Sequence, residues 1–188
     1  MSRMLLHICC GPCAPYVVEQ LKKEYEVTLY FYNPNIHPKK EYERRLVEAH
    51  RLAQDSDLPF IEEKYDPDNW HTATKGLENE PEKGKRCEVC FDIRLSKTAD
   101  TAARNGFDVF AAVLSVSPHK DAVMINRVGA SAGEHSGVKF LEANWKKKEG
   151  FKITTRMADD MGFYRQNYCG CVFSLRDRDK RETEKRNV

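Results

Sequence analysis

Apolar residues along the chain switch between short continuous runs and stretches with helical spacing. Residues 5–8 (LLHI) form a short apolar run, and residues 27–32 (VTLYFY) form one rich in β-branched and aromatic side chains, which is typical of strands. Residues 14–25 and 38–56 follow these runs and carry apolar side chains three or four positions apart, which predicts helices. The pattern therefore predicts two strand–helix units in succession.

Two more strands are predicted further along the chain. Residues 59–61 form a short apolar run, and residues 107–114 form a longer one after a helix that ends at Gly106. Strands that alternate with helices favour a parallel sheet with helices on both faces. We therefore expect an α/β fold of the Rossmann-like kind, with a helical C-terminal part.

The size and charge of the chain suggest one domain and a charged tail. The chain has 188 residues and a formal net charge of +2, so bulk charge alone does not indicate a nucleic-acid binder. We expect a single domain over residues 1–174 and a tail over residues 175–188, whose interleaved charges suit a solvated helix. The basic run of Lys146, Lys147 and Lys148 either meets phosphates or, more commonly for a triplet, lies in a solvated turn.

The first residues lack the apolar region and cleavage site of a secretion signal. No run approaches the ~18 apolar residues of a membrane span. We therefore expect a cytoplasmic protein with no membrane partner. In a reducing compartment, clustered cysteines bind metal or change redox state more often than they form structural disulfides.

The cysteines are the most informative residues. Cysteines that serve packing are scattered, whereas short-spaced pairs can direct two sulfurs at one point. There are seven, an odd number, and all of them fall into three groups: Cys9, Cys10 and Cys13; Cys87 and Cys90; and Cys169 and Cys171. This grouping predicts a metal or redox site.

The predicted topology can bring these groups together. Cys9 and Cys10 follow the first strand, residues 33–35 (NPN) follow the second, and residues 115–120 follow the fourth. The carboxyl ends of parallel strands share one edge of a sheet, where sites gather. Cys87 and Cys90 lie near the start of a helix, whose amides favour thiolates and anionic clusters.

Three kinds of site could use these cysteines. A thioredoxin-like dithiol at Cys10 and Cys13 would leave the other two groups unexplained. A structural zinc site could take two C-x-x-C pairs, although these come from separate elements. An iron–sulfur cluster could take four thiolates from the first two groups and leave the third as a dithiol. A radical-SAM site is disfavoured because Tyr16 stands where its third cysteine would be.

Cys169 and Cys171 are separated by one residue. A disulfide between them would be strained and relatively easy to reduce. A dithiol can exchange two electrons, and a cluster passes them one at a time. Together they suggest a reductase.

Five motifs in one order resemble a known family. They are residues 7–13 (HICCGPC), residues 33–38 (NPNIHP) with Glu41, Tyr42 and Arg45, residues 86–95 (RCEVCFDIRL), residues 114–120 (LSVSPHK) and residues 164–171 (YRQNYCGC). The chain is similar, from residue 4 to about residue 174, to the epoxyqueuosine reductase QueH family. The resemblance implies reduction of the epoxide of epoxyqueuosine at the wobble position of tRNA, with tRNA and an external electron donor as partners. It also implies a fold related to HUP and PP-loop domains, with residues 9–13 in place of the pyrophosphate loop and no use of ATP.

The resemblance further implies roles for the cysteines. Cys9, Cys10, Cys87 and Cys90 would hold a 4Fe-4S cluster, and Cys169 with Cys171 would be a redox-active pair. Cys13 could ligate a second, mononuclear iron or complete the site by packing.

Opening an epoxide to an alkene requires two electrons and a Lewis acid or a proton donor at the oxygen. Asp92 is a candidate for binding iron or hydrogen-bonding a ligand, although a carboxylate on a helix surface is the commoner case. Tyr168 and His7 are candidate proton donors, and His7 on an apolar strand better fits a core histidine.

Substrate binding should use basic and aromatic groups near the edge of the sheet. The candidates for phosphates are Arg86, Lys120, Arg165 and the run of three lysines, and the candidates for stacking on a base are Tyr32, Tyr164 and Tyr168. Each aromatic side chain could equally belong to the core. Asn33 is a further candidate contact.

Overall fold

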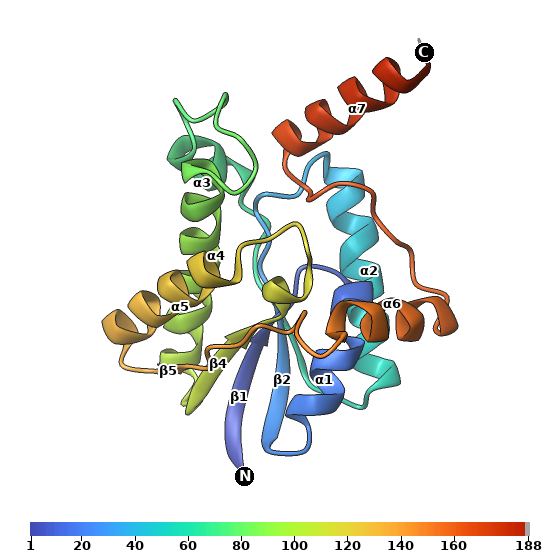
Figure 1. Ribbon diagram of the computed structural model, residues 1–188. Coiled ribbons are helices and arrows are strands. Elements are labelled where there is room, and N and C mark those ends of the chain that lie inside the picture. Colours follow the sequence, from blue (N-terminus) through green and yellow to red (C-terminus); the bar gives the residue numbers. More distant parts are fainter. Residues whose placement is uncertain (187–188) are drawn as a thin grey trace.

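The computed structural model describes residues 1–186 and contains one parallel sheet of five strands (Figure 1). The strand order is β3-β2-β1-β4-β5, and every neighbouring pair is parallel. The strands are β1 (Ser2–His7), β2 (Tyr25–Phe31), β3 (Phe60–Glu62), β4 (Val109–Ala112) and β5 (Lys139–Phe140). The predicted α/β fold is therefore confirmed.

Helices cover both faces of this sheet (Figure 1). The α-helices are α1 (Pro15–Leu21), α2 (Lys39–Asp55), α3 (Pro67–Ala73), α4 (Lys85–Arg104), α5 (Ala122–Ser136), α6 (Gly150–Asp160) and α7 (Val172–Arg186). Two short 3-10 helices follow strands, η1 (Gly11–Cys13) after β1 and η2 (Val113–Val116) after β4. In Figure 1, α4 and α5 lie on one side of the sheet, and α1, α2 and α6 lie on the other.

The central strands are buried because helices cover them on both sides. Leu6 in β1 pairs with Leu29 in β2 and with Ala111 in β4, and all three side chains are fully buried. Strands buried on both faces read as continuous apolar runs. This is why residues 5–8 and 27–32 stand out in the sequence.

Several boundaries differ from those predicted. The first helix is shorter than residues 14–25, because η1 precedes it and β2 already begins at Tyr25. The apolar run at residues 107–114 forms a four-residue strand and then turns into η2, so apolar character continues where the strand has ended. The pattern did not predict α3, α5, β5 or α6.

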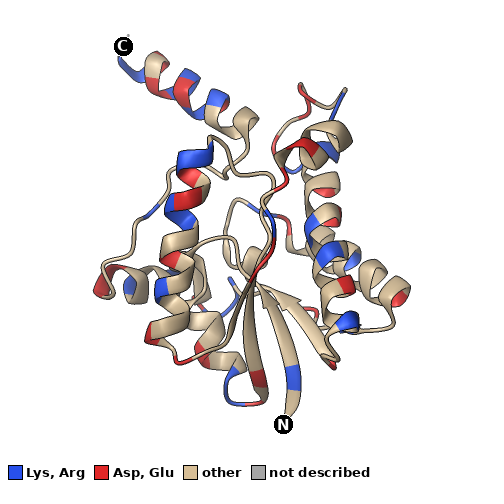
Figure 2. Ribbon diagram, turned by 180° about the vertical axis from the view of Figure 1, so that it is seen from behind, with Lys and Arg blue, Asp and Glu red and all other residues tan. Residues whose placement is uncertain are grey.

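The charged C-terminal segment forms α7, which extends away from the body of the protein (Figure 1). None of its residues is buried, and Lys and Arg alternate with Asp and Glu along it (Figure 2). This arrangement matches a solvated helix. The helix begins at Val172, and the division into residues 1–174 and 175–188 stays a prediction; residues 187–188 lie outside the described part. Over residues 1–186, no helix combines the length and the apolar character that a membrane span requires.

Candidate metal and redox centre

The three cysteine groups lie at the carboxyl edge of the sheet. Cys9, Cys10 and Cys13 follow β1, and Lys120 lies in the loop after β4 and η2. Helix α4 begins just before Cys87, and the segment before α7 brings Cys169 and Cys171 to the same place. All seven cysteines are free thiols.

Cys9, Cys10 and Cys13 form the tightest group. Their sulfur atoms lie within 4.8 Å of one another, and the sulfurs of Cys9 and Cys10 are 3.7 Å apart. Cys9 and Cys10 are buried and Cys13 is half-buried. Three converging thiols of this kind can hold a metal ion or an iron–sulfur cluster.

Helices α2 and α6 fix the turn that carries this group. A Cβ atom on Gly11 would lie 2.8 Å from the backbone oxygen of Glu48 in α2, so only glycine lets the turn approach this closely. On the other side, Thr154 in α6 donates a hydrogen bond of 3.4 Å to the backbone oxygen of Pro12. The turn is therefore held from both sides.

The three thiols share negative charge unequally. Hydrogen bonds from Cys10 and Cys13 hold the pKa of Cys9 well below its usual value, while burial raises the pKa of Cys10. For Cys13, the hydrogen bond with Cys10 lowers the pKa, but the bond to Cys9 and burial outweigh it and raise the pKa to about 12. Metal ligands must be thiolates. A bound cation would supply the positive charge that favours the thiolate forms of Cys10 and Cys13.

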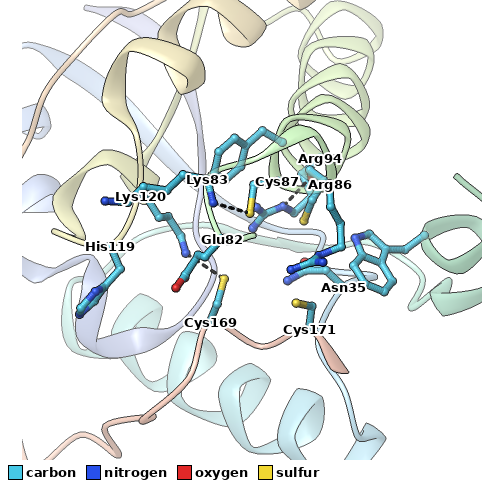
Figure 3. Close-up of a pocket in the computed structure, with 13 residues that line it drawn as sticks. Asn35, Glu82, Lys83, Arg86, Cys87, Arg94, His119, Lys120, Cys169 and Cys171 are labelled. Carbon is cyan, nitrogen blue, oxygen red and sulfur yellow. Dashed lines mark hydrogen bonds between the residues drawn. The ribbon is translucent and has the colours of Figure 1, made fainter. Parts of the chain in front are cut away.

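The other four cysteines line one narrow pocket (Figure 3). Cys87 and Cys90 lie three residues apart in the first turns of α4, so both face this pocket. The backbone N–H of Lys83 donates to the Cys87 sulfur at 3.3 Å. Burial raises the pKa of Cys87 to about 11 and raises that of Cys90 as well.

Cys169 and Cys171 enter the pocket from the segment before α7. Lys120 donates a hydrogen bond of 3.2 Å to the Cys169 sulfur (Figure 3). The Cys171 sulfur instead accepts from the backbone N–H of Ser174, at 3.3 Å, in the first turn of α7. An ammonium and a helix amide each stabilise negative charge on the sulfur that they face.

Two cations lie among the sulfurs, the buried Arg94 and the half-buried Lys120. Arg94 donates from Nε to the backbone oxygen of Cys90 at 3.0 Å, and within residues 1–186 neither Arg94 nor Lys120 forms a salt bridge with a carboxylate. Burial opposes the charge of Lys120, but its interactions with the sulfurs of Cys169 and Cys9 outweigh it and raise its pKa. Arg94 behaves in the same way, and among the neighbouring sulfurs that of Cys90 contributes most to its raised pKa. The charge of each cation is therefore stabilised by sulfurs from more than one of the three cysteine groups.

Two residues that were predicted to contact substrate, Arg86 and Asn33, are buried and hydrogen-bonded to the backbone. Arg86 is buried, and its Nη1 donates to the backbone oxygens of Leu77, Glu78 and Glu80, so it shapes the loop before α4. Asn33 is buried and donates to the backbone oxygen of Ile8 at 3.0 Å. Their roles toward substrate stay predictions.

Tyr164 and Arg165 lie nearer the surface. The Tyr164 hydroxyl donates to a Glu41 carboxylate oxygen at 3.2 Å, and Arg165 pairs with Asp159 at 3.4 Å. Both remain candidates for contact with substrate.

The side chains predicted to take part in the chemistry lie outside the lining of the pocket: Asp92, a candidate iron or ligand contact, and the candidate proton donors Tyr168 and His7. Asp92 is exposed and accepts a hydrogen bond from Ser96, and the Tyr168 hydroxyl donates to the backbone oxygen of His37. His7 lies in the core, where burial and the charge of Arg94 lower its pKa to about 4. The pocket lining instead contains Lys120, His119 and Glu82.

Three residues of the site were not assigned a role from sequence. Arg94 follows Cys90 by four residues, a helical spacing that could have identified it. Gln166 donates to the Cys10 sulfur at 3.0 Å, and Arg45 contacts the segment around Cys169. These two contacts span more than a hundred residues, so no local spacing could have indicated them.

The chain matches a known family over most of its length. The family model described as "Epoxyqueuosine reductase QueH" matches residues 4–177. A relative from Histophilus somni, also described as epoxyqueuosine reductase QueH, is 45% identical over 181 residues, which are 95% of this chain and 74% of that protein. A relative of the same description from Thermotoga maritima is 36% identical over 187 residues, 98% of this chain and 96% of that protein.

Two solved structures share the fold at low sequence identity. One is a predicted subunit of a tRNA methyltransferase from Methanocaldococcus jannaschii, with a TM-score of 0.55 and 15% identity over 84% of this chain and 76% of that one. The other is the U34-tRNA thiolase NcsA from Methanococcus maripaludis with its 4Fe-4S cluster, with a TM-score of 0.54 and 11% identity over 98% of this chain and 66% of that one. At these identities the likeness supports the fold alone.

Proposed function

Because the chain belongs to the epoxyqueuosine reductase QueH family, oxidoreductases that act on tRNA in the last step of queuosine biosynthesis, we propose that its cysteines form one reducing centre. The centre would reduce the epoxide of epoxyqueuosine at the wobble position of tRNA. The observation that carries the proposal is the convergence of seven free thiols, the buried Arg94 and the half-buried Lys120 at one edge of the sheet. A cytoplasmic location suits this substrate.

The donor set fits a 4Fe-4S cluster. We assign Cys9, Cys10, Cys87 and Cys90 as its ligands, as the family resemblance implies, because such clusters are held by four cysteine thiolates. A cluster with four thiolate ligands is anionic. Within residues 1–186, the buried Arg94 and the half-buried Lys120 have no carboxylate partner. Buried charges are costly unless they are compensated, so these cations support an anionic occupant.

Cys13 remains available for a second, mononuclear iron. Its sulfur belongs to the tight group with Cys9 and Cys10, and Gln166 Nε2 lies 3.8 Å from it. A bound cluster supplies electrons one at a time, and iron with an open position supplies a Lewis acid.

The dithiol can supply the two electrons and two protons that the reaction consumes. Conversion of an epoxide to an alkene takes two electrons and two protons and releases water. Oxidation of Cys169 and Cys171 to a disulfide gives up two electrons and two protons, and an external electron donor then restores the dithiol. The Lys120 ammonium holds a proton 3.2 Å from the Cys169 sulfur, where the proton can follow the electrons.

Phosphate contacts would come from the exposed part of the basic run. Lys147 and Lys148 are exposed, whereas Lys146 is half-buried and donates to the backbone oxygen of Lys120 at 2.7 Å. We therefore assign phosphate contacts to Lys147, Lys148 and the exposed Arg165. Lys146 fixes the turn that carries Lys120.

Metal analysis of anaerobically purified protein tests the proposal. We expect about four iron and four sulfide per chain, with additional iron if Cys13 holds a second metal. The same protein should convert epoxyqueuosine in tRNA to queuosine when it receives electrons. Zinc in place of iron, or no metal, would refute the cluster and favour a dithiol mechanism.

A further inference from the structure

The side chain of Arg45 in α2 is bonded to the segment that carries Cys169 and Cys171. It is only 1% exposed, and its Nη1 and Nη2 donate to the backbone oxygens of Cys169 at 2.9 Å and Tyr168 at 3.2 Å. Its Nε donates to Glu41 at 2.7 Å, which fixes the plane of the guanidinium. Arg45 therefore holds the backbone on the N-terminal side of Gly170 by two hydrogen bonds.

The backbone at Gly170 is also tightly packed and hydrogen-bonded. Its φ of 130° lies in a region that side chains rarely adopt, and a Cβ there would lie 3.0 Å from Arg45 Nη1 and 3.2 Å from Ile36 Cγ1. Its backbone oxygen accepts a hydrogen bond of 2.8 Å from the N–H of His37. The backbone between the two cysteines is therefore bonded from α2 and from the loop after β2.

The two sulfurs of the pair have different partners in this conformation. Cys169 faces Lys120, and Cys171 faces the first turn of α7. A disulfide requires the two Cβ atoms to approach to about 3.5–4.5 Å with a defined dihedral angle. Formation of a Cys169–Cys171 disulfide would take both sulfurs away from these partners. It would also strain the backbone to which Arg45 is hydrogen-bonded.

We infer that Arg45 is a positioning residue that holds the Cys169-Gly170-Cys171 backbone in its open dithiol conformation and so raises the reduction potential of the pair. The inference rests on the proposed function, in which the pair alternates between dithiol and disulfide. Contacts that exist only in the reduced form stabilise that form, and this makes the disulfide a stronger oxidant. Its physical consequence is that the disulfide left after each turnover is easily reduced by the external donor.

Thiol–disulfide equilibria measured on the metal-loaded protein test the inference. Wild-type protein and Arg45→Met are equilibrated anaerobically with mixtures of reduced and oxidised dithiothreitol, which breaks or forms the disulfide by a two-electron, two-proton exchange. After alkylation, trypsin releases residues 166–176, in which Cys169 and Cys171 are the only cysteines, and mass spectrometry gives the disulfide fraction. We expect the equilibrium constant of Arg45→Met to shift about tenfold toward the disulfide, which is a potential about 30 mV lower.

Arg44→Met is the matched control. The Arg44 guanidinium lies over the ring of Tyr164, 3.2 Å from its centre, and no hydrogen bond joins it to residues 168–171 in the described structure. We expect its equilibrium constant to equal that of the wild type. Arg45→Lys, which keeps the charge but not the two-pronged donor, should give an intermediate constant.

Two outcomes separate the inference from the proposed function. Equal equilibrium constants in wild type and Arg45→Met would overturn the inference alone. A wild-type protein that forms no Cys169–Cys171 disulfide in any mixture would overturn the redox role of the pair, and the inference with it. If Arg45→Met does not fold, Gly170→Ala decides, because its Cβ would press on Arg45 and should shift the constant in the same direction.

Discussion

Lys120 is half-buried, its ammonium lies 3.2 Å from the Cys169 sulfur, and it has no carboxylate partner within residues 1–186. A buried lysine that keeps its charge needs a negative neighbour, because desolvation favours the neutral form. The sulfurs of Cys169 and Cys9 provide that neighbour. Lys120 was predicted from sequence to meet a phosphate, whereas the structure places its ammonium against the sulfur of Cys169.

Replacement of Lys120 by Met should make Cys169 a weaker nucleophile. A hydrogen bond to a charged group is worth about 1.5–3 kcal/mol, so we expect alkylation of Cys169 by iodoacetamide to slow about tenfold. Lys120→Arg should retain most of the rate, and Lys97→Met, at a lysine that pairs with Glu63, should leave it unchanged. An unaltered rate in Lys120→Met would show that the ammonium does not activate this thiol.

His37 gives the protein a pH-dependent stability. Burial and the neighbouring His71 lower the pKa of His37 to about 4, whereas an unfolded histidine titrates near about 6.5. Between these values the unfolded chain binds a proton that the folded protein does not, so the free energy of unfolding falls as pH decreases through this range. The effect is absent above it.

Urea denaturation at pH values on both sides of this range measures the effect. Because His37 is half-buried, we expect a loss of about 1 kcal/mol between neutral pH and about pH 4.5, after allowance for solvent screening. His37→Gln should remove this part of the pH dependence. If the variant kept the full slope, another group would be responsible.

At the scale of elements, the position of η1 decides whether three thiols can converge. Its close approach to α2 depends on Gly11, and its bond to α6 depends on Thr154. Neither contact is local in sequence. The spacing of Cys9, Cys10 and Cys13 therefore predicted a site, but it could not predict which helices hold that site in place.

Gly11→Ala should disturb the proposed metal site. The added Cβ would lie 2.8 Å from the Glu48 oxygen, and overpacking of this kind costs about 1–3 kcal/mol. We expect the variant to fold and to retain less than about half of the wild-type iron, measured per chain after anaerobic purification. Gly137→Ala is the control, because its φ of 73° strains any side chain while nothing lies within 4 Å of the added Cβ. Similar iron contents in both variants would contradict the proposed importance of this contact.

Sequence patterns predicted the central strands and missed several later elements for a physical reason. Strands β1 and β2 are long and buried, so their residues form apolar runs. Strand β5 contains only Lys139 and Phe140, which is too short for any period to be visible. Similarly, Cys169 and Cys171 could be recognised as a pair, but the contact of Cys169 with Lys120 depends on how residues 163–171 cross the edge of the sheet.

At the scale of the whole molecule, the centre lies at one edge of the sheet, and any tRNA must approach that edge. The net charge of +2 provides little general attraction for RNA, so local basic residues must supply the phosphate contacts. Lys147 and Lys148 are exposed beside the turn that Lys146 anchors to Lys120. The basic run thus combines one structural lysine with two that are free to meet phosphate.

These two kinds of lysine should give different phenotypes. Lys147→Ala with Lys148→Ala should weaken tRNA binding about tenfold and reduce the salt dependence of the association constant by about 1.4 in log–log slope, since each lost contact with single-stranded RNA removes about 0.7. Lys146→Ala should leave that slope unchanged and lower the alkylation rate of Cys169, because it releases the turn that holds Lys120. Filter binding of tRNA across a salt series measures the first effect. Lys139→Ala, at the opposite end of the sheet, is the control for loss of a surface charge.

A slope that changes equally in Lys146→Ala and in the double variant would contradict this division. It would mean that all three lysines meet phosphate and that the hydrogen bond from Lys146 to the Lys120 turn is dispensable.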